Sequence, residues 1–179
     1  MNNKNIDRSS ALELLKKHIS DEMLRHHSLM VAEAMAAYAQ KLGENSDFWY
    51  VTGLLHDLDW QSHPEEHPFK AVNDWLKDYP NELKRAILAH APGITKVEAR
   101  TAIERYLFAC DEICGLMNAV ALMRPNRFVD MKVKSVTKKI KDKSFAANIS
   151  REDIKQGFLL INKTPTEHIE FLINVFRNW

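Results

Sequence analysis

The chain of 179 residues has few glycines and prolines, which break helices, and few cysteines, which form disulfides. It contains five glycines, six prolines and two cysteines, and no low-complexity segment. The cysteines, Cys110 and Cys114, lie four residues apart in a helical pattern, which favours core thiols in a reducing compartment over a disulfide framework. No apolar run approaches the roughly 20 residues of a membrane span, and residues 1–10 lack the apolar core of a signal peptide. These absences predict a cytoplasmic protein that does not enter a membrane.

The charge is nearly balanced but unevenly distributed. A formal net charge of +1 argues against a globally basic nucleic-acid-binding protein. Residues 124–155 nevertheless carry ten Lys or Arg against four Asp or Glu, whereas residues 1–123 carry thirteen against eighteen. The basic segment is interpreted either as a solvated helix face or as a basic wall that faces an anionic substrate.

Helix signals run along the whole chain, and no run alternates with period two for long enough to predict a strand. Serine caps are expected at Ser10, with Glu13 completing a capping box, and at Ser20; Thr164 and Glu167 form a similar pair near the end. We therefore expect an all-α protein with a single domain over residues 1–179, built as a bundle of about eight helices. The first expected helix begins at Ser10, and the others cover residues 21–43, 46–57, 68–78, 80–91, 95–123, 131–141, 151–161 and 165–177.

Ligand-type side chains fall on apolar helix faces. His27 and His90 each share a stripe with aliphatic residues, and Asp57 and Asp111 lie in the apolar stretches "GLLHDLDW" and "YLFACDEIC". A lone buried histidine is ordinary, but an unpaired buried carboxylate is costly. Because no Lys or Arg falls on these faces, the expected partner is a metal ion held by imidazole and carboxylate groups from separate helices. Such ligands suit Mn²⁺, Fe²⁺, Ni²⁺, Co²⁺ or Zn²⁺, with Mg²⁺ also compatible.

Three segments in this order resemble the HD superfamily of metal-dependent phosphohydrolases, and the later stretch "KVKSVTKKIKDKSFA" resembles the tail of its small bacterial members. The three segments are "RHHSLMVAEAMA", "TGLLHDLD" and "FACDEICGL", which together give the superfamily's H…HD…D order. The motif region runs from about residue 20 to 125 and is followed by a basic helical extension over about 126–179. The resemblance implies an HD-type helical domain whose metal ligands are His27, His56, Asp57 and Asp111.

The resemblance also bears on a second ion. His67 and His90 match positions that supply a second ion's ligands in two-metal members, with Asp57 bridging. The histidine that commonly follows the later ligand is replaced here by Ala91. One ion is expected, and two are the alternative. With one ion, His67 and His90 would instead contact phosphate oxygens or protonate a leaving group, so the expected catalytic residues are Asp57, His67 and His90.

Other charged residues are candidates for the surroundings of the site. Asp59 could orient a water, or it could be a surface acid at a helix end. Phosphate contacts are expected from lysines of the basic segment, namely Lys132, Lys134, Lys138 and Lys139.

The expected function is hydrolysis of a phosphate ester, in a nucleotide or related small molecule, by metal-activated water. The expected partner is therefore a small anionic phosphorylated substrate. Two alternatives stay open. One is a two-iron HD-fold oxygenase, which requires both His67 and His90 as ligands. The other is a non-catalytic module with a structural metal, in which the basic segment binds nucleic acid or a protein.

Overall fold

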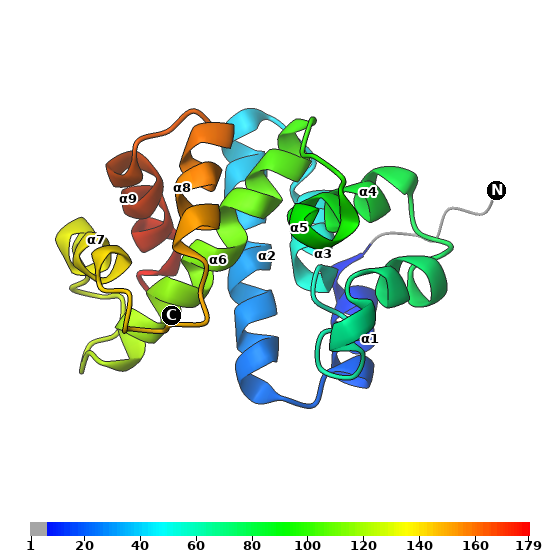
Figure 1. Ribbon diagram of the computed structural model, residues 1–179, viewed down its shortest axis with the longest axis horizontal. Coiled ribbons are helices and arrows are strands. Elements are labelled where there is room, and N and C mark those ends of the chain that lie inside the picture. The colour runs from blue at the N-terminus through cyan, green and yellow to red at the C-terminus, as the bar shows by residue number, and fades with distance from the viewer. Residues whose placement is uncertain (1–6) are drawn as a thin grey trace. The chain divides into compact units, whose positions relative to one another are not determined.

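Helices account for the architecture of this chain. The computed structural model describes residues 7–179, and in that range it contains helices and no strand, which confirms the predicted all-α class. No helix within these residues is both long and apolar enough to cross a bilayer. In order, the elements are α1 (Arg8–His18), α2 (Glu22–Leu42), α3 (Ser46–Leu55), the 3₁₀ turn η1 (Pro64–Glu66), the π-helix η2 (Ala71–Trp75), α4 (Asn81–His90), α5 (Pro92–Thr95), α6 (Ala102–Leu122), α7 (Val133–Lys141), α8 (Arg151–Leu160) and α9 (Pro165–Phe176) (Figure 1).

The chain divides into two compact units. The first unit ends at Phe108, and the second extends from Ala109 to Trp179. The boundary falls within helix α6, which is unbroken. Its residues up to Phe108 belong to the first unit, and the rest belong to the second. That residues 1–179 act as one domain stays a prediction.

In the first unit, α2 and α3 lie side by side and form the centre of the apolar core (Figure 1). Gly53 makes the close approach of these helices possible, because a Cβ atom added there would lie 3.0 Å from the Cα of Ala32 and from the carbonyl oxygen of Val31. Around them pack buried apolar side chains from α1, η2 and α4, including Leu15, Val72 and Leu83. Because His27 lies on α2 and His56 directly follows α3, this contact brings the two histidines together.

The N-terminal caps of the first two helices differ from the prediction. Asp7, not Ser10, caps α1 by accepting from the Ser10 amide at 2.8 Å. Asp21, not Ser20, caps α2 by accepting from the Leu24 amide at 2.8 Å. A carboxylate at this position satisfies a backbone donor and also complements the positive end of the helix.

Two predicted helices have different bounds. The helix expected over residues 68–78 is mainly the π-helix η2, whose wider turn is confined to Ala71–Trp75. The helix expected from Thr95 begins only at Ala102. The cause is Glu104, whose carboxylate accepts from the amides of Arg100 at 2.6 Å and Thr101 at 3.1 Å and pairs with the Arg85 guanidinium. These contacts hold the preceding segment outside the helix.

The second unit contains α7, α8 and α9 with the later part of α6. Helix α7 packs beside α9 (Figure 1). Gly157 of α8 sits directly on α6, since an added Cβ would lie 2.9 Å from the Cα of Ala109. Thr164 caps α9 in a complete capping box with Glu167, as predicted. Cys110 and Cys114 are free and buried, and burial raises the pKa of both thiols.

Candidate metal centre

The pair of adjacent ligand-type residues lies just past the end of a helix. Asn45 caps α3 by accepting from the amides of Asp47 and Phe48, and the helix ends at Leu55. His56 and Asp57 follow, and the chain continues through tight turns in which the Trp60 amide donates to the Asp57 carbonyl. His56 still has helical backbone angles, with φ −61° and ψ −37°, yet its Nε2 lies 3.4 Å from Asp57 Oδ2, so the two side chains converge just beyond the end of the helix.

On one side, Asp57 faces His27 and His56. Its Oδ2 lies 3.8 Å from the Nε2 of His27 and 3.4 Å from the Nε2 of His56. We call these three residues the His27 cluster; their ligand atoms lie within 4.8 Å of one another. The side chain of His56 is fully buried, whereas those of His27 and Asp57 keep 18% and 14% of their surface exposed. The cluster is therefore reachable from solvent on the His27 side.

On the other side, Asp57 faces His67 and His90. Its Oδ1 lies 3.6 Å from the Nε2 of each histidine. His67 follows η1, and His90 is the last residue of α4. We call Asp57, His67 and His90 the His90 cluster; their ligand atoms also lie within 4.8 Å of one another. The two clusters thus share one carboxylate and use a different oxygen of it.

The Nδ1 atoms of three histidines are held by oxygen acceptors. His56 Nδ1 donates to the Gly53 carbonyl at 2.7 Å, and His90 Nδ1 donates to the Ile87 carbonyl. His67 Nδ1 donates to the Asp59 carboxylate at 2.7 Å. Because a carbonyl or ionised carboxylate only accepts, each Nδ1 carries a proton, so a ring in its neutral form presents its lone pair at Nε2. Metal-binding histidines are commonly anchored in this way.

The donor set of the His90 cluster fits a cation. The Nε2 atoms of His67 and His90 lie only 3.1 Å apart. With both Nδ1 atoms protonated, two neutral rings at this separation would point lone pair at lone pair, which is repulsive unless a proton or metal ion lies between them. Two imidazole ligands at about 2.1 Å from one ion and at right angles would be about 3 Å apart. The residues present therefore fit a divalent metal.

Asp57 stays ionised in these surroundings. Burial alone would raise its pKa, but the charge and hydrogen bonding of His56, followed by those of His90, outweigh burial and hold the pKa well below its usual range. At neutral pH the side chain is a carboxylate. It can bind a cation from either oxygen, and it does not serve as a proton donor.

The sequence leaves two roles open for Asp59, which could orient a water or be a surface acid at a helix end. The alternative that it is a surface acid is wrong, because its side chain is completely buried. It accepts from His67 Nδ1 and, through its other oxygen, from the Ala71 amide at 2.8 Å. The one signal in the sequence was its position in "LLHDLDW", where it stands between Leu58 and Trp60.

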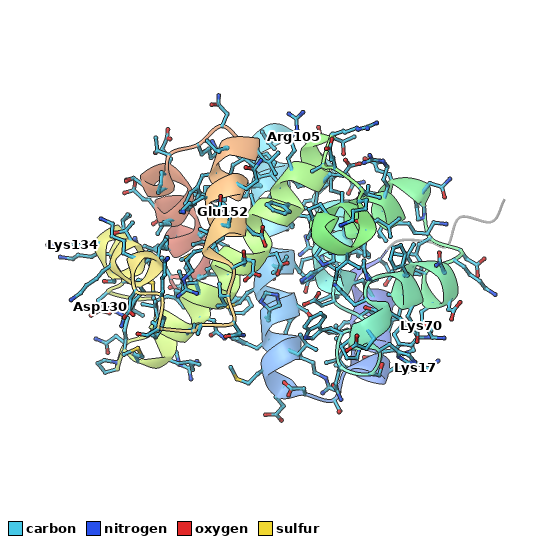
Figure 2. The ribbon with its side chains drawn as sticks, viewed as in Figure 1. Lys17, Lys70, Arg105, Asp130, Lys134 and Glu152 are labelled. Carbon is cyan, nitrogen blue, oxygen red and sulfur yellow. The ribbon has the colours of Figure 1, made fainter. Side chains whose placement is uncertain are left out.

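The remaining predicted site residues lie in the second unit. Asp111 is on α6, three residues beyond Phe108, and is partly buried. Lys132, Lys134 and Lys138 are exposed at or near α7, and Lys134 points away from that helix into solvent (Figure 2). Lys139 is paired with Asp142 at 3.0 Å and lies over the Phe145 ring. Of the four predicted lysines, Lys139 already has a local partner.

Comparison with known protein families identifies the family of this chain. The model of the HD domain family matches residues 24–116, just over half of the chain. The chain belongs to the HD domain family. The matched range contains His27, His56, Asp57 and Asp111 in the order of the HD pattern, as well as His67 and His90. No curated protein and no solved structure matched the chain.

Proposed function

We propose that this HD domain protein is a metal-dependent phosphohydrolase that acts on a phosphate ester, in a nucleotide or a related small molecule. The observation that carries the proposal is the shared carboxylate of Asp57, with the Nε2 atoms of His27 and His56 near one oxygen and those of His67 and His90 near the other. A small anionic phosphorylated substrate would approach from the partly exposed His27 side.

The proposed ligands of the principal ion are His27, His56 and Asp57 from the first unit, with Asp111 assigned as the fourth from the HD order of the family. A divalent ion held there would supply Lewis acidity, lowering the pKa of the water it binds towards about 7 and withdrawing charge from a phosphate oxygen. Imidazole and carboxylate ligands favour Mn²⁺, Fe²⁺, Co²⁺, Ni²⁺ or Zn²⁺, with Mg²⁺ also compatible.

The residues themselves supply the rest of the chemistry. Asp57 remains ionised, so it can accept a hydrogen bond from the attacking water and align it. His67 and His90 take one of two roles. They either hold a second ion, which would relieve the opposed Nε2 lone pairs, or share a proton at that position and deliver it to the leaving oxygen.

The two-iron oxygenase is a second candidate, because the His90 cluster places Asp57, His67 and His90 within ligand distance of one another. It requires two equivalents of iron and consumption of oxygen, whereas hydrolysis requires neither. Metal content therefore separates the two candidates before any substrate is known.

The first experiment is elemental analysis of untagged protein purified without chelators, beside Asp57→Ala and the control Asp78→Ala. Asp78 is exposed and lies outside both clusters. We expect at least one equivalent of a transition metal in the parent and in Asp78→Ala, and less than a tenth of that in Asp57→Ala.

The metal-loaded parent would then be screened against phosphomonoesters and phosphodiesters, including nucleotides. We expect turnover that a chelator abolishes and that Asp57→Ala lacks. A parent that holds no metal and cannot be loaded with Mn²⁺, Fe²⁺, Ni²⁺ or Zn²⁺ would refute the proposal. Chelator-insensitive nucleic-acid binding without turnover would instead favour the non-catalytic module.

A further inference from the structure

A completely buried carboxylate stands directly behind His67. Asp59 has no exposed surface, and both of its oxygens are used: Oδ1 accepts from His67 Nδ1 at 2.7 Å, and Oδ2 accepts from the Ala71 amide at 2.8 Å. Burying a carboxylate is costly unless its hydrogen bonds are made in full. This one contacts no Lys or Arg among the described residues, so its two donors are a backbone amide and an imidazole.

The two groups that donate to Asp59 differ in whether their proton can move. The Ala71 amide is a fixed donor at the start of η2, whereas a neutral histidine can place its proton on either ring nitrogen. With Oδ2 occupied by the fixed donor, Oδ1 remains for His67. The ring responds by protonating Nδ1 and leaving Nε2 as the acceptor. That Nε2 lies 3.6 Å from Asp57 Oδ1 and 3.1 Å from His90 Nε2.

We propose that Asp59 is a positioning residue of this site, which fixes the tautomer and ring orientation of His67 so that its Nε2 serves as an acceptor beside Asp57 and His90. Trp60 limits the ring from another side, with its own ring edge-on to His67 at 5.0 Å between centroids. This assigns His67 to cation binding at the His90 cluster. The assignment to a metal rests on the proposed function, whereas the control of the tautomer by Asp59 does not.

Asp59→Asn tests this proposal because it preserves shape and changes only the donor pattern. The asparagine oxygen must face the Ala71 amide, since that donor cannot change. Its amide group then faces His67 Nδ1, which has to become an acceptor. The ring proton moves to Nε2 and the lone pair facing Asp57 and His90 is lost.

The measurement is ¹⁵N–¹H correlation NMR of histidine-labelled, full-length protein, with His67→Gln used to assign the His67 signals. Spectra are taken without metal at about pH 8.5, above the ordinary histidine pKa of ~6.5. We expect Nδ1 of His67 to be protonated in the parent and unprotonated in Asp59→Asn. Asp74→Asn is the matched control, because that acid is half-exposed and pairs with Lys70 outside the site; it should leave the His67 signals unchanged.

Two results would overturn the proposal: an unprotonated Nδ1 in the parent, or a protonated Nδ1 of His67 in Asp59→Asn. The result for the parent stands by itself if Asp59→Asn does not fold. Because a ring released into solvent also favours a proton at Nε2, circular dichroism and the dispersion of the other histidine signals must first show that Asp59→Asn is folded; its tautomer then reports positioning and not stability.

A Mn²⁺ titration of the same proteins separates this inference from the proposed function. If His67 changes tautomer as expected while the parent binds no Mn²⁺ or other divalent ion, the role of Asp59 holds and the metalloenzyme proposal fails. If the parent binds Mn²⁺ but His67 keeps its tautomer in Asp59→Asn, the reverse is true. With both proposals correct, Asp59→Asn weakens binding at the His90 cluster by about 10–100-fold.

Discussion

Acid should destabilise the second unit through His168. This α9 side chain is fully buried, its Nε2 donates to the Ala109 carbonyl at 3.0 Å, and its ring lies edge-on to Phe158. Burial lowers its pKa from 6.5 to about 4; the bond to Ala109 opposes this shift, and Lys163 adds to it. The histidine is therefore neutral in the folded protein at pH values where it is charged in the unfolded chain.

The sign and size of the effect follow from linkage. Because the folded-state pKa lies below the unfolded value, the unfolded chain binds more protons as the pH falls below 6.5, and stability is lost between 6.5 and about 4. At 1.36 kcal/mol for each unit of pKa, the full loss is roughly 3 kcal/mol, and about 2 kcal/mol of it has occurred by pH ~5.

The assay is urea unfolding of metal-free protein, followed by far-ultraviolet circular dichroism at several pH values between about 7.5 and 4.5. His168→Gln is the comparison, because glutamine can still donate to the Ala109 carbonyl but does not titrate. We expect the parent to lose about 2 kcal/mol more than the variant between pH ~7.5 and ~5. Parallel pH profiles for the two proteins would refute this account of His168.

Two further predictions concern packing and capping in the first unit. Gly53→Ala should lower the free energy of unfolding by about 1 kcal/mol, since overpacking of about 1–3 kcal/mol against Ala32 exceeds the ~1 kcal/mol gain in helix propensity. Gly93→Ala, where an added Cβ meets nothing within 4 Å, should be neutral or stabilising in the same urea titration. Glu104→Gln should cost about 1–3 kcal/mol by weakening the charged contact with Arg85, and an unchanged urea midpoint would contradict this role.

The sequence predicted correctly those features of the fold that involve only residues close together in the chain. Thr164 and Glu167 are three residues apart, so their capping box needs nothing outside α9. The predicted start of α6 was wrong by several residues. The reason is that Glu104 accepts from the amides of Arg100 and Thr101 while it pairs with Arg85, which lies on another helix. A contact between distant segments decides that boundary, and helical periodicity does not contain it.

The same distinction applies to the site. The HD pattern predicts that His27, His56 and Asp57 lie together, and the resemblance also matches His67 and His90 to the positions of a second ion's ligands. The sequence does not decide the role of Asp59, because that role depends on the turns after α3, which bring His67 into contact with it. The sequence shows that Asp57 and Asp59 are two residues apart. It does not show that Asp57 faces both clusters whereas Asp59 accepts a hydrogen bond from His67.

Cations bound at the two clusters would be thermodynamically linked, because both would use the carboxylate of Asp57. Asp57 cannot be replaced without affecting both, whereas His27 and His90 can be changed one at a time, and a double-mutant cycle between them measures how strongly the clusters communicate. By reciprocity, the factor by which a cation at the His27 cluster changes cation affinity at the His90 cluster equals the factor by which a cation at the His90 cluster changes affinity at the His27 cluster. The steepness of a metal-binding isotherm therefore reports whether binding at the two clusters is positively or negatively cooperative.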